Sequence, residues 1–135
     1  MEANRATLAR LAASFGDPAR SEEYFAQYDE ACTIHGNSPE PFGHAGLRAY
    51  YTALWAALVD TVLLVDAEVV EGDQAAWRWR VTGTHAGELL GVAATGRTLE
   101  LAGQTFWRFG PDGRVLERWT VADALGLRAQ LGLEP

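Results

Sequence analysis

The sequence has little with which to build a disulfide or a metal site, because it holds one cysteine and three histidines among 135 residues. Cys32 cannot form an intramolecular disulfide on its own, and no Cys-x-x-Cys or closely spaced histidine pattern points to a metal or redox centre. No glycine-rich phosphate loop precedes a helix. Neither a metal nor a cofactor is therefore expected.

Basic residues and long apolar runs are also scarce. Eleven basic side chains stand against 18 acidic ones, for a net charge of −7, which argues against nucleic acid or an anionic membrane as a partner. The longest strongly apolar run, at 62–65, is too short to span a bilayer. The first 14 residues lack the apolar core of a signal peptide. The expected location is the cytoplasm.

What the sequence does have is a large apolar and aromatic complement. Hydrophobic residues make up 48% of the chain, and five of its residues are tryptophan. A chain of this length predicts one domain, spanning 1–135. Because tryptophan combines a large apolar surface with an N–H that needs a partner, several together often line a core that borders a cavity.

Hydrophobic periodicity predicts helices first and strands afterwards. Apolar residues recur at helical spacing over 8–15, from about 19 to 28, and most clearly from Gly46 to Leu58. A period of two follows and predicts strands over 61–71, 74–85, 97–109 and 114–121, with a short earlier strand at 31–35 and a short helix at 124–131. This order predicts an α+β domain whose curved sheet and helices enclose a pocket.

Three segments resemble the SnoaL-like polyketide cyclase family, which has the cone-shaped fold of nuclear transport factor 2. They are Gly-Thr-His-x-Gly at 83–87, Thr-Gly-Arg at 95–97, and Asp-Gly-x-x-x-Glu-x-Trp at 112–119 followed by Asp123. The resemblance covers roughly 34–132. It implies a curved antiparallel or mixed sheet with about three N-terminal helices, a small apolar or aromatic polyketide-like ligand, and a homodimer or higher homo-oligomer.

The resemblance also assigns roles to individual residues. In the family's cyclases an aspartate just after the last-strand tryptophan acts as the base, which corresponds to Asp123. A polar residue on the neighbouring strand helps to hold the substrate, which corresponds to Gln104. Phe106 departs from the pattern, because a second polar residue, often histidine, is usual there.

Asp123 has two possible roles on the residues alone. In an uninterrupted strand, Trp119, Val121 and Asp123 share one face, so an inward-facing Trp119 predicts an inward-facing Asp123. A carboxylate among apolar residues has a raised pKa, which suits proton abstraction. Alternatively, Asp123 caps the helix that begins at Ala124. The family resemblance favours the base.

The remaining candidates would support that base. His35 follows a short strand and would be an acid or hydrogen-bond donor at the pocket mouth, or else a rim residue with local contacts. Gln104 would face inward and orient a carbonyl or enolate oxygen, or else point outward. The expected ligand-binding residues share an aromatic or amide side chain near the cone interior: Trp119, Phe106, Trp79, Asn37 and Tyr51.

The preferred hypothesis is a cofactor-independent, polyketide cyclase-like enzyme in which Asp123 removes an α-proton and an intramolecular aldol reaction closes a ring. A non-catalytic ligand-binding or dimerisation module of the same fold is the alternative from another class. Two other enzymes remain open in the same pocket. One is an isomerase with a helical tyrosine as oxyanion donor, and the other is an epoxide hydrolase with Glu117 as second carboxylate.

Overall fold

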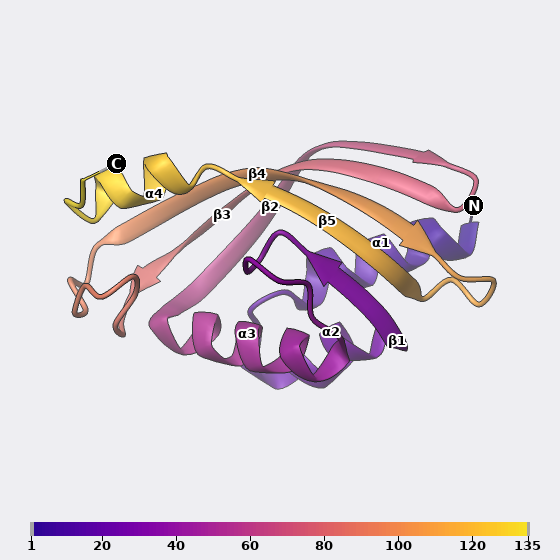
Figure 1. Ribbon diagram of the computed structural model, residues 1–135, viewed down its shortest axis with the longest axis horizontal. Helices are drawn as coiled ribbons and strands as arrows, with labels where there is room; N and C mark the ends of the chain where they lie inside the picture. Colours follow the sequence, from indigo (N-terminus) through magenta and orange to yellow (C-terminus); the bar gives the residue numbers. More distant parts are fainter. Residues whose placement is uncertain (1, 135) are drawn as a thin grey trace.

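In a computed structural model, which describes residues 2–134, helices pack against one face of a five-stranded sheet (Figure 1). In chain order the elements are α1 (Glu2–Ser14), the 3-10 helix η1 (Pro18–Arg20), α2 (Ser21–Ala26), β1 (Tyr28–His35), α3 (His44–Ala57), β2 (Leu58–Glu71), β3 (Gln74–His85), β4 (Thr98–Phe109), β5 (Val115–Ala122) and α4 (Ala124–Gln130). The predicted α+β class, with a curved sheet and helices on one side, is confirmed.

The sheet has the strand order β1-β5-β4-β3-β2, in which only the β1–β5 pair is parallel. The turn between β2 and β3 contains Gly72 with a φ of +59°, a left-handed conformation that glycine adopts without strain. The long strands arch over α1 and α3, and β1 lies beside β5 below the arch (Figure 1). The space between the arch and α3 is where a pocket can form.

Helix α3 covers the concave face of the sheet because its apolar residues recur on one side. Leu47 and Tyr51 are buried four residues apart, and Leu54 and Trp55 continue the same side toward the sheet. Leu8 and Leu11 of α1 are fully buried in the same core. None of the described helices combines the length and apolar composition needed to cross a bilayer.

Two element boundaries differ from the sequence prediction. Tyr28, expected at the end of a helix, begins β1, so that strand is three residues longer than predicted. Strand β2 follows α3 directly from Leu58 instead of starting at 61. The pairing of β2 with β3 shifts register between Val59 and Val62, and Asp60 there has a φ of +52°. A bulge therefore replaces the expected loop.

A second bulge decides which side chains of β5 face the cone. Phe109 pairs with Val115 and Arg108 pairs with Glu117, so Leu116 is an extra residue in β5. Beyond the bulge the alternation is inverted relative to an uninterrupted strand. Arg118 faces the interior, and Trp119 and Val121 face outward with exposed fractions of 37% and 77%. The expectation that Trp119 and Val121 face inward is wrong for this reason.

Candidate functional site

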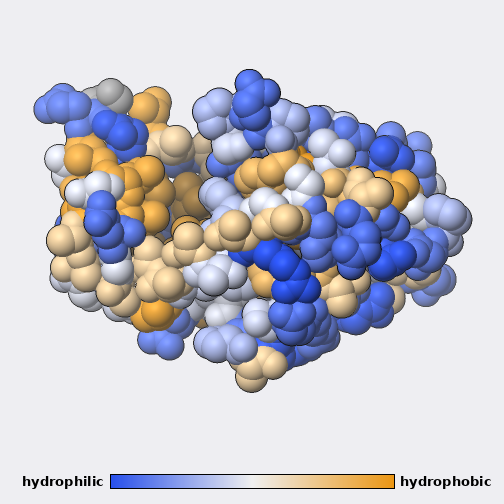
Figure 2. Space-filling view, turned by 60° about the horizontal axis from the view of Figure 1, so that its bottom comes forward, coloured by the Kyte–Doolittle hydropathy of each residue, from blue (hydrophilic) through white to orange (hydrophobic). Residues whose placement is uncertain are grey.

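The concave face of the sheet and α3 enclose a pocket of about 340 Å³. Three tryptophans of the sheet (Trp77, Trp79 and Trp107) line it, as do Tyr51 and Leu54 of α3. Leu89 of the loop after β3 also lines it, as do Ala124 and Leu127 of α4. Hydrophobic side chains gather around a hollow beside the α4 end of the molecule (Figure 2). Walls of this kind suit a flat apolar ligand.

The polar end of the pocket is built around Arg118, whose side chain is 2% exposed. One terminal nitrogen, Nη1, donates to the Tyr28 hydroxyl at 2.9 Å and to the Tyr51 hydroxyl at 3.0 Å. The other, Nη2, donates to Oδ1 of Asn37. The guanidinium also lies 5.5–5.9 Å from the ring centres of Tyr28, Tyr51 and Trp107, distances at which a cation is attracted to a ring face.

Burial shifts the pKa values of the side chains in this cluster. Burial raises the pKa of Tyr28 to about 12, and it raises the pKa of Tyr24 well above its usual value. Burial by itself disfavours the charged form of Arg118, but the phenol oxygens of Tyr28 and Tyr51 outweigh it and keep the pKa of the guanidinium above its usual value. At neutral pH Tyr24 and Tyr28 are therefore neutral and Arg118 is a cation.

Three of the residues expected to bind a ligand do line the pocket. Trp79 faces inward and donates from Nε1 to the Thr105 hydroxyl at 2.9 Å. Asn37 and Tyr51 lie at the polar end, where both contact Arg118. Tyr51 comes from α3 and Asn37 from the loop after β1, so two segments far from β5 in sequence converge on the guanidinium.

Asp123 does not point into the pocket. Its carboxylate accepts a hydrogen bond from the Gly126 amide at 2.8 Å, and its side chain is exposed. The alternative prediction, that Asp123 caps the helix beginning at Ala124, is therefore confirmed. Its neighbours Ala122 and Ala124 line the pocket, which places Asp123 at the edge of the pocket. Its role as a base stays a prediction.

Four other candidates lie on the outer face of the sheet. Gln104 and Phe106 alternate outward on β4 and are exposed. The His35 ring stacks on the Trp119 ring at 5.3 Å with an interplanar angle of 3°. For Gln104 the outward alternative is the one observed, whereas the expectation that Phe106 and Trp119 face the interior is wrong. Thr105 and Trp107 are buried on β4, so the alternate positions 104 and 106 point outward. The bulge in β5 turns Trp119 outward.

His35 belongs to an ion-pair cluster on this outer face. Its Nε2 lies 2.7 Å from one carboxylate oxygen of Glu117, and Arg108 donates to the other oxygen at 3.1 Å. The hydrogen bond with His35, reinforced by Arg108, holds the pKa of Glu117 below its usual value. Glu117 therefore does not provide a second carboxylate beside Asp123 inside the cone.

Arg118 was not identified from the sequence, although a signal for it was present. Tryptophans are expected to line the core, and the hairpin that turns at 110–113 pairs Trp107 with Arg118. Cross-strand partners lie on the same face of a sheet. An inward-facing Trp107 therefore requires an inward-facing Arg118, provided that the bulge is recognised.

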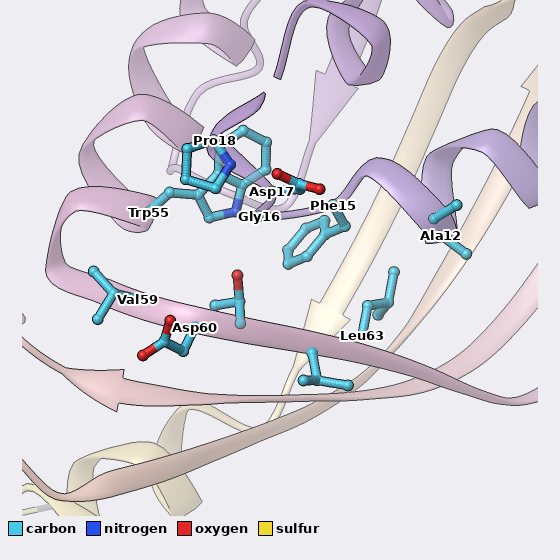
Figure 3. Close-up of a pocket in the computed structure, with 12 residues that line it drawn as sticks. Ala12, Phe15, Gly16, Asp17, Pro18, Trp55, Val59, Asp60 and Leu63 are labelled. Atoms are coloured by element: carbon cyan, nitrogen blue, oxygen red, sulfur yellow. The ribbon is translucent and has the colours of Figure 1, made fainter. Parts of the chain in front are cut away.

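A second groove of about 450 Å³ adjoins this pocket and shares Phe15 and Leu63 with it (Figure 3). Phe15, Gly16 and Trp55 form one wall, and Val59 and Leu63 of β2 contribute to the other. The groove contains none of the residues singled out from the sequence. Within residues 2–134, no group of three or more histidine, cysteine, aspartate or glutamate side chains is arranged to hold a metal ion.

Comparison with known proteins supports the resemblance seen in the motifs. The model of the family described as SnoaL-like polyketide cyclase matches residues 5–131. A search of curated protein sequences gives no significant match. The sequence match therefore rests on the family model and covers nearly the whole chain.

Several solved structures share the fold. AclR from Streptomyces galilaeus, a proposed hydroxylase, superposes with a TM-score of 0.89 at 24% identity and covers 100% of this chain and 99% of its own. IdmH from Streptomyces antibioticus, a proposed polyketide cyclase, has a TM-score of 0.80 at 28% identity, with coverages of 96% and 99%. TsrD from Streptomyces laurentii has a TM-score of 0.82 at 26% identity, with coverages of 98% and 97%.

Proposed function

The chain belongs to the SnoaL-like polyketide cyclase family, and from this premise we propose that it is a cofactor-independent enzyme that closes a ring in a small polyketide-like molecule. One observation carries the proposal: the cone holds a pocket with aromatic walls and hydrogen-bond donors gathered at one end. A folded, partly aromatic chain fits such walls. Donors at one end favour a single orientation of its oxygens.

The proposed reaction is an intramolecular aldol addition. Asp123 removes a proton from a carbon next to a carbonyl, and the enolate carbon attacks a second carbonyl to form the new carbon–carbon bond. The alkoxide left on that carbonyl then takes up a proton. A positioned base contributes typically about 10²–10⁴-fold, and holding both reacting carbons together adds an effect of proximity.

Asp123 can act in this way only after its carboxylate leaves the amide of Gly126. The loss of such a cap costs about 1 kcal/mol, a small cost that ligand binding can offset. The position of Asp123 between Ala122 and Ala124, both of which line the pocket, supports this proposal. The base would therefore work from the mouth, on the part of the substrate nearest to α4.

The test is exchange of α-protons for deuterium in methyl naphthyl ketone, a flat ketone whose spontaneous exchange is slow. The unmodified protein should accelerate the exchange, followed by NMR in D₂O, and Asp123→Asn should lower the acceleration at least about 100-fold. Asparagine is as good a helix cap as aspartate, so the helix is retained. Asp112→Asn, in an exposed turn, is the matched control. No acceleration by the unmodified protein, or equal acceleration by Asp123→Asn, would refute the proposal.

Two alternatives use the same pocket. A non-catalytic binding module is favoured by the engagement of the Asp123 carboxylate in a helix cap, and it predicts that the ketone quenches tryptophan fluorescence without any exchange. An isomerase would use the Tyr51 hydroxyl as oxyanion donor, since this hydroxyl lines the pocket beside Arg118. In that case Tyr51→Phe would reduce exchange more than it reduces binding.

We also propose that the outer face of the sheet binds a second copy of the chain. Phe106 and Trp119 pack edge to face with ring centres 5.8 Å apart, and both remain about 40% exposed beside Val121. Exposed aromatic patches of this kind mark interfaces. Light scattering should give the mass of a dimer for the unmodified protein and of a monomer for Trp119→Glu. A monomeric unmodified protein would refute this part.

A further inference from the structure

Arg118 is a buried cation with no buried anion beside it. Within the part of the chain that the structure describes, no carboxylate lies within ion-pair distance of its guanidinium. Its partners are two neutral phenols and one neutral amide. Taking a charged group out of water costs several kcal/mol unless an opposite charge and further hydrogen bonds compensate it. The cluster therefore holds a positive charge inside the cone that hydrogen bonds and aromatic rings stabilise but that no opposite charge balances.

The hydrogen-bonding capacity of the cluster is not exhausted either. A guanidinium has five N–H donors, and the Arg118 contacts use three of them. Its Nε is buried and has no partner. The Tyr51 hydroxyl accepts from Arg118, and within residues 2–134 its own proton has no acceptor. The unused donors belong to residues that line a mostly apolar pocket, whose other polar side chains include Thr105, Thr120 and Glu100.

We propose that Arg118, Tyr51 and Asn37 form a subsite for a carboxylate, so that the ligand of the cone is a flat apolar acid bound with its acid group at Arg118. A carboxylate supplies the missing charge and accepts N–H and O–H hydrogen bonds. Charge-assisted hydrogen bonds are roughly twice as strong as neutral ones. A neutral ligand would leave the charge of Arg118 uncompensated, and a cationic ligand would be repelled.

The proposed subsite fixes the direction of the ligand. Arg118 and Asp123 are five residues apart on one extended segment, which separates their Cα atoms by roughly 16 Å. With the acid group at Arg118, the apolar body extends past Trp79 toward Leu127. The carboxylate of the ligand and that of Asp123 then lie at opposite ends of the cone, and their repulsion is small.

The inference names the substrate class for the proposed enzyme, but its test does not depend on catalysis. Naphthoate and naphthamide share the same flat body and differ only in the charge of one end group. Their affinities would be measured by calorimetry at neutral pH and low salt. The unmodified protein should bind naphthoate at least about tenfold more tightly than naphthamide, the ratio expected when a buried charged hydrogen bond replaces a neutral one.

Two variants test whether the preference for naphthoate arises at Arg118. Arg118→Met fills a similar volume without charge and should abolish the preference for naphthoate. Arg78→Met removes an exposed arginine from the outer face and should leave the preference unchanged. The comparison of the two probes on the unmodified protein does not require either variant to fold.

Each outcome decides between the two proposals. Equal binding of both probes would overturn the carboxylate subsite and leave the apolar pocket of the proposed enzyme intact. A preference that survives in Arg118→Met would also overturn the subsite, since the anion would then bind elsewhere. Binding of neither probe would overturn the subsite together with the aromatic ligand of the proposed function. Binding of naphthoate without exchange of the ketone would leave the subsite standing and refute only the catalytic proposal.

Discussion

Replacing Asn37 by aspartate would place a carboxylate against the guanidinium of Arg118 with almost no change in side-chain size. Asn37 already accepts a hydrogen bond from Arg118 through Oδ1, the atom that becomes a carboxylate oxygen. The substitution therefore supplies, within the protein, the charge that we expect a ligand to bring. It tests whether Arg118 is an uncompensated cation without the need for any ligand.

The expected gain can be bounded from the geometry. Two unit charges about 4 Å apart attract by about 4 kcal/mol at the effective dielectric constant of 20 that suits partly buried sites. Desolvation of the new carboxylate opposes this, but Asn37 is only partly buried, so the opposing cost is smaller than in a sealed core. A net gain of about 1–3 kcal/mol is expected, which raises Tm by on the order of 5–10 °C in a chain of this size.

Thermal unfolding by circular dichroism measures the change, and Ala94→Asp is the control. It adds the same charge to an exposed loop, where no stabilisation is expected. The arginine lowers the folded-state pKa of the new carboxyl below its unfolded value of about 3.9, so the extra stability should persist at neutral pH and disappear as the pH falls through the folded-state pKa. The variant should also lose the preference for naphthoate. An Asn37→Asp protein no more stable than Ala94→Asp would refute the idea of a missing countercharge.

Two further substitutions test the surroundings of the pocket. Asp123→Ala should lower the free energy of unfolding by about 1 kcal/mol through loss of the helix cap, whereas Asp123→Asn should change it little. Urea unfolding of the two variants measures this difference. Equal effects of the two substitutions would contradict the capping geometry. The lowered pKa of Glu117, caused by His35 and then Arg108, gives stability that is present above the unfolded-state pKa near 4.5 and is lost as the pH falls through the folded-state value. Glu117→Gln should therefore be less stable than the unmodified protein at pH 7 and approach it near pH 3, whereas exposed Glu71→Gln should show no such convergence.

The course of the chain could be predicted from the sequence because local signals agreed with one another. The alternation of Trp77, Trp79 and Val81 with arginine and threonine predicted a strand with two unlike faces, and the structure buries the face that carries these three residues. The turn at Gly72 fixed the hairpin that joins β2 to β3. The motifs at 83–87 and 112–119 pointed to the family, which the match over 5–131 confirmed.

The interior of the site could not be predicted because a single extra residue inverts the alternation of β5. Leu116 sits in a bulge with no marked sequence signal, since it is neither glycine nor proline. An unbulged strand would have put Trp119 inside and Arg118 outside, which agrees with the usual rule that apolar residues are buried. In the structure Arg118 lies inside and Trp119 lies outside. Inside the cone, the Tyr28 and Tyr51 hydroxyls accept hydrogen bonds from the Arg118 guanidinium, and on the outer face the His35 ring stacks on Trp119.

This reversal bears on how the pocket can select a ligand. Apolar walls alone discriminate weakly, since one methylene group changes binding by only about 1–3 kcal/mol. A buried polar group left without a partner discriminates more strongly, because every ligand that fails to satisfy it incurs a cost. Arg118 is such a group at one end, and the exposed carboxylate of Asp123 near the mouth disfavours a second acid group at the other. The cone therefore favours molecules with one acidic end and one neutral end, and it orients them before any chemistry takes place.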